Sequence, residues 1–378
     1  MLRLLLRPIE TLLLALIGYN LVVALFGWRD PQPPQRASTR SHRFRILIPA
    51  HDEAAVIDNL LSDLAVPMQE KSCEVVVLAD HCTDETASVA RARGVTVAER
   101  TEGDGGKGAA LKWYLDRWPL DADEALVVLD ADNRVPADLL DRFADELAAG
   151  HHVLQAYLGV SNPDASSVAT ASALSYWASN RMVQLARRNL GWTADLGGTG
   201  MCITAEALDA VGGFGTSFAE DQELGVRLFR AGYPVTWIHD LQVLDEKPRE
   251  AAVAVKQRSR WASGRREVAR AHARQLFSSG DPAAIDLAIR LVQPSRMGVA
   301  AISGLLTILS ALGAPTFGVV TWLAATSVQV LAPVAFLWKE GVERRYLLRY
   351  PVLALIPVLK IPARLIRQTG WYHTPHSG

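Results

Sequence analysis

The chain has 378 residues and a formal net charge of −1, with 39 Lys and Arg against 40 Asp and Glu. That balance argues against a nucleic-acid-binding protein, which would carry an excess of basic residues. Cys73, Cys82 and Cys202 are too few and too scattered for a disulfide framework or a Cys-x-x-Cys metal site. The length suits two domains, or one large domain with a smaller one.

An uncharged, apolar segment occupies residues 11–28, close to the minimum of about 17–25 residues that crossing a bilayer requires. No small-x-small cleavage site follows it, so we favour a membrane anchor over a cleaved signal peptide. Arg3 and Arg7 precede the segment, and further arginines from Arg29 onward follow it. The positive-inside tendency then places the next domain in the cytoplasm. Residues 30–41, rich in Pro, Gln and Ser, are expected to form a linker.

From Phe44 onward, short apolar runs alternate with helical patterns. The runs typical of buried strands are residues 44–50, 74–79, 95–98, 125–129 and 233–239. Alternating strands and helices predict an α/β fold, with a mostly parallel sheet covered by helices on both faces. Polar residues follow several of these strands, and such sheets bind ligands at the carboxyl ends of their strands.

The end of the chain is apolar again. Residues 297–338 contain no charged side chain, which is enough for two membrane helices of about 20 residues each, with a break predicted at residues 313–315. Basic residues follow, again a cytoplasmic signature. Residues 350–359 are apolar but contain two prolines, and we expect an interfacial or re-entrant segment.

We therefore expect three parts. Residues 1–42 form an N-terminal transmembrane anchor and linker, and residues 43–275 form a cytoplasmic α/β domain. Residues 276–378 form a C-terminal membrane region with interfacial helices and a cytoplasmic tail. The protein is expected in the plasma membrane, with more than one crossing.

Asp130 and Asp132 directly follow a predicted strand. Alternate residues of a strand share a face, so both carboxylates can point at one ligand. Carboxylate oxygens suit Mg²⁺ or Mn²⁺, which bind together with substrate phosphates. A turn-forming role is the alternative for such a common pattern. His239, at the end of the last predicted strand, is a further metal candidate, although a strand-end histidine is more often structural.

Asp80 and Lys107 are candidates for nucleotide binding. Asp80 ends a predicted strand, where it either caps a turn or accepts hydrogen bonds from a base or ribose. Lys107 lies in the glycine-rich run at residues 103–108, which is flexible enough to approach phosphates while the lysine supplies a cation. The run lacks the spacing of a Walker loop.

Glu220 and Asp221 stand just before a helix-like run at residues 224–230. Acids in this place favour the N-terminal end of a helix as caps. The functional alternative is that Asp221 is a general base that takes a proton from a substrate hydroxyl. Glu220 then either raises the pKa of Asp221 as a neighbouring like charge or is a solvated cap.

Gln257, Arg260 and Trp261 share one face of a predicted helix, at spacings i, i+3 and i+4. One interpretation is a basic amphipathic helix beside a membrane. The other assigns the arginine to a leaving diphosphate and the indole to sugar stacking.

Taken in order, these motifs resemble the family 2 membrane glycosyltransferases, the group with cellulose, chitin, hyaluronan and poly-N-acetylglucosamine synthases. The motifs are I-P-A-H-D-E, Asp80, G-G-K-G, D-A-D, G-T-G-M-C, A-E-D and Q-R-S-R-W. The resemblance covers about residues 44–266, and W-Y-H-T at residues 371–374 is similar to a tail motif of that family. It implies a GT-A-like fold and an inverting, metal-dependent transfer of a sugar from a nucleotide-sugar, a UDP-sugar in this family.

The resemblance also implies residue roles. Asp132 would bind Mg²⁺ or Mn²⁺, with Asp130 as a second candidate, and Asp221 would be the catalytic base. The residues expected to bind the nucleotide-sugar are His51, Glu53, Asp80, Lys107 and Asp130. Those expected to flank the acceptor and the diphosphate are Gly200, Glu220, Gln257, Arg260 and Trp261.

The expected acceptor is a saccharide or a lipid-linked molecule in exopolysaccharide or cell-envelope glycan synthesis. Three predicted spans are few for a polysaccharide channel. Single-sugar transfer to a membrane lipid therefore stays open, as does a channel shared with a second copy or a partner membrane protein. A function of another class, an inactive scaffold of a polysaccharide secretion complex, is disfavoured because the chain keeps Asp80, Asp130, Asp132 and Asp221.

Overall fold

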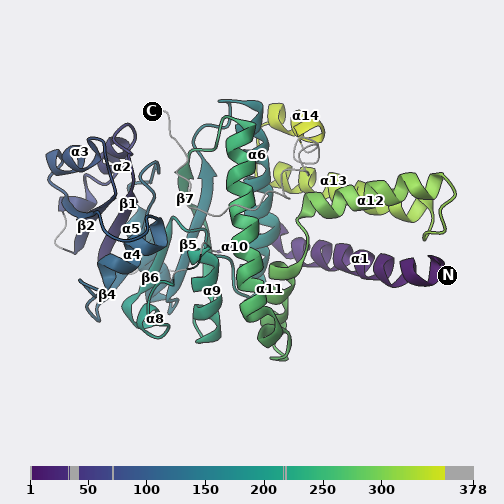
Figure 1. Cartoon of the computed structure of the whole chain (residues 1–378), viewed down its shortest axis with the longest axis horizontal. Helices are drawn as coiled ribbons and strands as arrows, with labels where there is room; N and C mark the ends of the chain where they lie inside the picture. The colour runs from purple at the N-terminus through teal and green to yellow at the C-terminus, as the bar shows by residue number, and fades with distance from the viewer. Residues whose placement is uncertain are drawn as a thin grey trace.

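The computed structural model describes residues 2–32, 34, 42–69, 72–215, 217 and 219–353. It shows an α/β part built on one sheet, with the apolar helices α1 (Leu2–Leu25), α12 (Arg296–Ala311) and α13 (Val319–Lys339) extending from one side (Figure 1). Two predictions lie wholly or partly outside the described residues. They are the tail motif at residues 371–374 and, from residue 354 on, the interfacial segment predicted at residues 350–359.

Within the described residues, seven strands form one sheet in the order β3-β2-β1-β4-β6-β5-β7. β6 runs antiparallel to β4 and β5, while the other pairings are parallel, so the sheet is mostly parallel as predicted. The strands are β1 (Arg43–Ala50), β2 (Cys73–Asp80), β3 (Thr96–Arg100), β4 (Glu124–Val128), β5 (Val153–Val160), β6 (Met201–Thr204) and β7 (Val235–Asp245).

The predicted strands correspond to β1, β2, β3, β4 and the first part of β7. β5 and β6 were not predicted, because β6 has four residues and both strands acquire their place only by pairing with each other and with β4. The expectation that His239 ends a strand is wrong, since β7 continues to Asp245 after an irregular register near Ala156 of β5.

Helices cover both faces of the sheet, because consecutive side chains of a strand point to opposite faces. On β1, Ile46 and Ile48 pack in one buried cluster and Leu47 in the other. The first cluster is closed by α2 (Ile57–Asp63), α3 (Thr86–Ala92) and α5 (Leu139–Ala148). The second is closed by α4 (Lys107–Leu115), α8 (Ala205–Asp209) and α9 (Glu220–Arg230).

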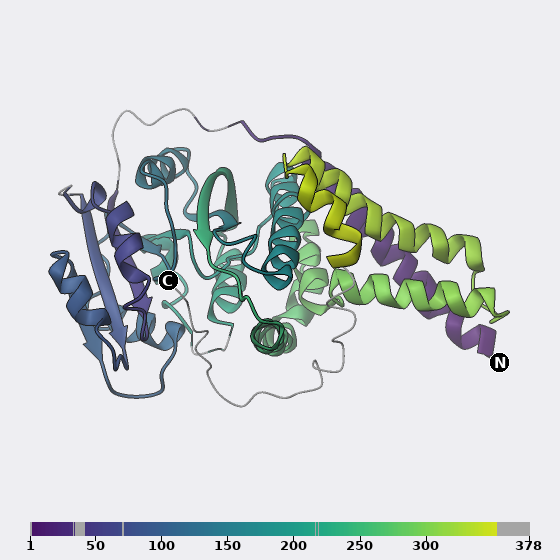
Figure 2. The same cartoon turned by 90° about the horizontal axis from the view of Figure 1, so that it is seen from above.

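The long helix α10 (Ala251–Phe277) lies between the sheet and the apolar helices and runs across their direction (Figures 1 and 2). It approaches the start of α9 closely, because a Cβ on Gly264 would come within 2.5 Å of the Cβ of Ala219. α11 (Pro282–Val292) packs against α10 through apolar side chains. The boundary expected between residues 275 and 276 falls within the last turn of α10.

Among the described residues, two helices are long and apolar enough to cross a membrane, Leu6–Trp28 and Val319–Lys339. The segment predicted as the middle span forms α12, whose 16 residues are slightly fewer than the ~17–25 of a typical crossing. α12 is bent by 69° from α11, and the pair would count as one broken span. Figures 1 and 2 both show α1, α12 and α13 side by side.

Polar contacts hold these apolar helices together. Glu10 on α1 is buried and accepts hydrogen bonds from the indole N–H of Trp322 and the backbone N–H of Phe317, each at 3.1 Å. Gln329 on α13 donates to Ser303 on α12 at 3.0 Å. Large apolar side chains point outward, among them Leu12, Ile9, Ile308, Val320 and Leu323. An exposed apolar surface of this kind is typical of a membrane or protein contact.

An ionic junction joins the apolar helices to the α/β part. A π-helical turn (Asn180–Leu185) follows α6 (Ser167–Ser179) and places Arg181 against Asp30 and Glu340. His239 also belongs to this junction: its Nε2 lies 3.3 Å from Glu340, and its Nδ1 accepts from the indole of Trp237 at 3.2 Å. Its Nε2 thus faces the base of the apolar helices, while its Nδ1 stays within β7.

Gly27, at the end of the first apolar segment, tests this junction. A Cβ there would overlap the backbone carbonyl oxygen of Arg181. We expect Gly27→Ala to lower the thermal midpoint in detergent by several degrees, since overpacking costs about 1–3 kcal/mol.

Gly18→Ala is the matched control, because Gly18 lies on α1, in the same apolar segment, and a Cβ there meets nothing within 4 Å. Its thermal midpoint should not fall, since Ala is the better helix former. Equal loss in both variants would show that the close contact with Arg181 carries no stability.

Candidate active site

Neighbouring strands bring the predicted polar residues to one edge of the sheet. β2, β1 and β4 lie side by side and parallel, so the residues that follow them meet at their carboxyl ends. Asp130 is held there through its backbone N–H, which donates to Asn133 Oδ1 and to Thr199 Oγ1, both at 2.9 Å. Thr199 in turn donates to Asn133. Asn133 and Thr199 are both buried. They fix the backbone of Asp130 and therefore the position from which its carboxylate extends.

Lys107, the first residue of α4, forms an ion pair with Asp130. Burial alone would lower the pKa of Lys107, but the carboxylates of Asp130, Glu220 and Asp221 outweigh it and raise that pKa. The lysine is therefore charged at neutral pH and lies among the carboxylates, where a diphosphate would bring further negative charge.

Asp132 and Glu53 add negative charge beside Asp130. Asp132 Oδ2 accepts the backbone N–H of Glu246 at 3.1 Å, at the end of β7. Burial, followed by the charges of Asp132 and Asp130, raises the pKa of Glu53 to about 9. These carboxylates repel one another, and hard oxygen donors gathered in this way fit Mg²⁺ or Mn²⁺.

Asp80 lies deeper than expected for direct ribose contact. It is 3% exposed, and its carboxylate accepts from Arg100 at 2.8 Å, from the backbone of Gly106 at 2.9 Å and contacts His81 at 2.9 Å. His51 Nδ1 bonds the carbonyl oxygen of Asp80 at 2.7 Å. Asp80 therefore shapes the loop that carries Lys107.

Glu220 and Asp221 form the first turn of α9, with Ala219 in the N-cap position. Burial raises the pKa of Asp221, against the opposing effects of the Gln222 N–H, Lys107 and Arg260. Burial and then the neighbouring Asp221 raise the pKa of Glu220 to about 7. Glu220 is half-buried, and Asp221 acts on it as a neighbouring like charge.

The glycine-rich loop before β6 faces Asp221 through Gly198. A Cβ on Gly198 would lie 3.2 Å from Asp221 Oδ2 and 3.8 Å from Lys107 Nζ, and its φ is +82°. Gly200, which was predicted to flank the acceptor and the diphosphate, directly precedes β6. Its N–H donates to Val128, and its carbonyl oxygen accepts from Ala156. The structure therefore brings Asp130, Lys107, Gly198 and Asp221 together.

Of the three residues predicted to share a face of α10, Arg260 acts on the carboxylates at the start of α9. The charge of Arg260 acts on both Glu220 and Asp221. Trp261 is 39% exposed, and Gln257 is half-buried on the same helix. Arg258 points elsewhere, toward Ser172 of α6 at 3.5 Å.

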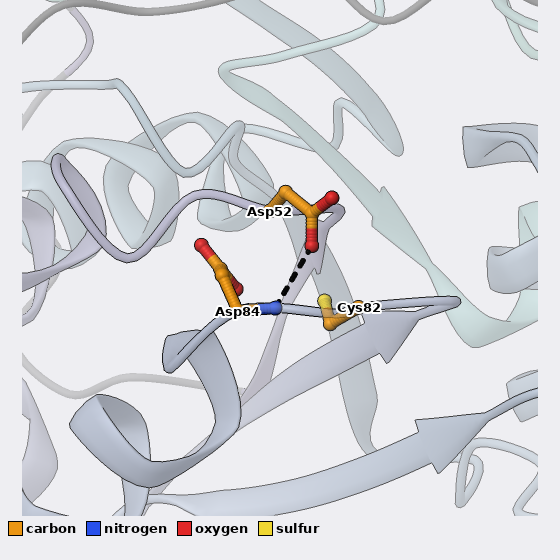
Figure 3. Close-up of side chains that lie close together, drawn as sticks. All are labelled: Asp52, Cys82 and Asp84. Carbon is orange, nitrogen blue, oxygen red and sulfur yellow. Dashed lines mark hydrogen bonds between the residues drawn. The ribbon is translucent and has the colours of Figure 1, made fainter.

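Within the described residues, Asp52, Cys82 and Asp84 form a group of potential metal-binding side chains, with ligand atoms within 4.8 Å of one another (Figure 3). Asp52 accepts from the backbone of Thr83 at 2.6 Å and of Asp84 at 3.2 Å, and Asp84 accepts from Ala54 at 3.0 Å. The Thr83 N–H is the main reason that the pKa of Asp52 is lowered. These acids tie the loop after β1 to the loop after β2.

Sequence reasoning missed Asn133, Gln155 and the specific role of Gly198. Gln155 is fully buried; it accepts from Gly197 and donates to the carbonyl of Thr199, both at 2.8 Å, so it holds the glycine-rich loop from below. A polar residue inside the apolar run of β5 was the available signal. Its partners could not be inferred because β5 itself was not predicted.

Comparison with known proteins assigns this chain to a protein family. Residues 42–264 match the family model "Glycosyltransferase like family 2", and the chain belongs to this family. It also resembles a solved mannosyltransferase, PcManGT from Pyrobaculum calidifontis in complex with GDP-Man and Mn²⁺. The TM-score is 0.61 at 19% identity, over 92% of this chain and 98% of that one. The GT-A-like fold expected from the motifs is confirmed, and the protein is a glycosyltransferase.

The curated relatives are lipid glycosyltransferases. The chain is 26% identical over 337 residues to a β-monoglucosyldiacylglycerol synthase of Nostoc sp., covering 83% of this chain and 69% of the relative. It is 28% identical over 236 residues to the protein of the same name from Synechocystis sp., spanning 58% of this chain and about half, 47%, of that relative. These are not members of the cellulose and chitin synthase group that the motifs suggested.

Gly198→Ala should reduce the rate of sugar transfer by about tenfold or more, because the Cβ would press on Asp221 and because a positive φ strains alanine by about 1–2 kcal/mol. Gly94→Ala is the control: its φ is +74°, but a Cβ there meets nothing within 4 Å. It should lose stability and keep activity. Equal rate losses in the two variants would exclude a specific role for the contact with Asp221.

Glu220→Gln should raise the thermal midpoint at about pH 8 and leave it nearly unchanged at about pH 4. A carboxyl whose folded-state pKa is raised loses stability as pH rises from its ordinary value toward about 7, and the amide removes this loss. Glu267→Gln, an exposed substitution on α10, should change neither value. A Glu220→Gln shift of the same size at both pH values would refute the electrostatic cause.

Proposed function

We propose that the protein transfers a single sugar from a nucleotide-sugar, a UDP-sugar, to a hydroxyl group of a membrane lipid, with inversion at the anomeric carbon. The observation that carries the proposal is the convergence of Lys107, Asp130 and Asp221 at the carboxyl edge of the sheet, against Gly198. A cation for a diphosphate and a half-buried carboxylate for an acceptor thus lie together.

Asp221 would act as the general base. A lipid hydroxyl is a weak nucleophile at neutral pH, and a carboxylate beside it removes its proton as the new glycosidic bond forms. Burial raises the pKa of Asp221, which makes it a stronger base, while Lys107 and Arg260 oppose this rise and favour its charged form. One displacement needs one protein carboxylate of this kind, and it inverts the sugar.

Lys107 and Arg260 would stabilise the leaving nucleoside diphosphate. Both are cationic at neutral pH, and both act on the carboxylates of α9. Asp132, with Asp130 and Glu53, would hold Mg²⁺ or Mn²⁺, because carboxylate oxygens are the donors that these ions prefer. The charges of Asp132 and Asp130 add to the effect of burial, which raises the pKa of Glu53. The bound ion would supply positive charge to the diphosphate.

The acceptor assignment is supported by two observations. The apolar helices α1, α12 and α13 extend from the part of the molecule that carries α10 and α11, so a lipid held in a bilayer would lie close to the α/β part. The curated relatives named above are diacylglycerol glucosyltransferases by name. Two or three candidate spans among the described residues suit lipid modification better than export of a polymer.

The same proposal includes the location and the domain arrangement. Residues 1–42 and 276–378 anchor the protein in the plasma membrane with more than one crossing, and residues 43–275 face the cytoplasm. The arginines that flank the first apolar segment support this orientation.

The test is transfer by purified full-length protein in vesicles that contain diacylglycerol, with Mg²⁺ or Mn²⁺ present. The donors are UDP-glucose, UDP-N-acetylglucosamine, UDP-galactose and GDP-mannose, and the product is identified by mass spectrometry. Asp221→Asn should lower transfer by about 10²–10⁴-fold while metal-dependent UDP binding persists. Asp116→Asn, an exposed substitution in a surface ion pair, should leave both unchanged.

A variant Asp221→Asn that keeps the wild-type rate would overturn the assignment of the base. A long sugar homopolymer made by the isolated protein would overturn single-sugar transfer.

A further inference from the structure

A buried ionic network connects the first apolar helix to the α/β part. Asp286 on α11 is fully buried, and its Oδ1 accepts from the hydroxyl of Tyr19 on α1 at 2.6 Å. The same carboxylate accepts from Arg187 at 2.9 Å and from Arg290 at 2.9 Å. Arg187 lies on α7 (Ala186–Leu190) and Arg290 on α11. Three separate helices therefore meet on one carboxylate.

The network continues into the chain that leads to the active site. Arg290 forms an ion pair with Asp195 and donates to the carbonyl oxygen of Thr193 at 2.8 Å. Asp195 is also held through its backbone N–H, which donates to Gln184 at 2.9 Å. Three residues further on, Gly198 lies against Asp221. The segment between them is thus fastened at one end by the network and reaches the catalytic carboxylate at the other.

The charges in this network balance. Arg187 and Arg290 carry two positive charges, and Asp286 and Asp195 carry two negative charges. Breaking one member of a buried ion pair is costly, because the remaining charge is left without its partner. Arg290 therefore holds the segment at Thr193 and Asp195, while Gln155 holds it at Gly197. Arg290 is itself held by Asp286, the partner of Tyr19.

We propose that Tyr19, Asp286, Arg290 and Asp195 are positioning residues that set the active-site loop, so that the first apolar helix is part of the catalytic unit and not only an anchor. This inference rests on the proposed role of Asp221. The hydroxyl of Tyr19 orients the carboxylate of Asp286, which orients Arg290. Arg290 then holds Asp195 and Thr193, and through them the place of Gly198 beside Asp221.

The experiment compares Tyr19→Phe and Asp195→Asn in the full-length protein reconstituted in vesicles. Tyr19→Phe removes the hydrogen bond to Asp286, and Asp195→Asn removes the negative charge that faces Arg290. Both substitutions preserve side-chain shape. We expect kcat to fall about tenfold, as small misplacements near reacting groups do, with KM for the donor and Mn²⁺-dependent UDP binding unchanged. In the double variant the two losses should not add, because both residues act through one network.

Asn20→Ala is the matched control. Asn20 lies beside Tyr19 on α1 and also joins α11, through a 2.9 Å hydrogen bond to Gln293, but that contact does not lead to residues 193–198. It should change stability and keep kcat. Hydrogen exchange of residues 193–200 supplies a readout independent of turnover: it should speed up in Tyr19→Phe and not in Asn20→Ala.

Wild-type kcat and unchanged exchange in Tyr19→Phe and Asp195→Asn would overturn the inference, as would equal kcat losses in Asn20→Ala. These outcomes are distinct from failure of the proposed base, which would appear as an active Asp221→Asn variant with the network effects intact.

Discussion

Crowding of carboxylates at one edge of the sheet is the constraint on which the rest of the structure depends. Burial, followed by the charges of Asp132 and Asp130, raises the pKa of Glu53, and burial raises the pKa of Asp221. Such a cluster is stable only if cations and backbone donors hold it. Lys107 and Arg260 supply the positive charge, and the N–H groups at the start of α9 supply part of the rest.

Close backbone approach makes this arrangement possible. Gly108 on α4 leaves room for Glu220, whose Cβ would lie 2.9 Å from an added Cβ, and Gly264 on α10 leaves room for Ala219. Gly198 does the same for Asp221. Helices α4, α9 and α10 can therefore meet at one point, and larger side chains would move the charged groups apart by more than the chemistry tolerates.

Buried ionic contacts join the base of the apolar helices to the α/β part, and a simple membrane anchor would not require them. The π-helical turn and Arg181 join α13 to β7, while Asp286 joins α1 to the segment before Gly198. Ionic contacts buried between separate elements favour one arrangement because mispairing leaves charges unpaired. The apolar helices and the α/β part are thus expected to keep a defined relation, as the proposed transfer to a membrane lipid requires.

By itself, the sequence determined most of the alternation of strands and helices and the apolar segments, because these follow from local periodicity. The resemblance of its motifs to a glycosyltransferase family implied that Asp130, Lys107 and Asp221 serve one site. Only the tertiary structure decided that Gly198 faces Asp221 and that His239 faces the apolar helices. Strand pairing settles these places, and pairing joins residues far apart in the chain. The link from Tyr19 to Asp286 is of the same kind, since no local pattern reveals which buried charge a distant hydroxyl will meet.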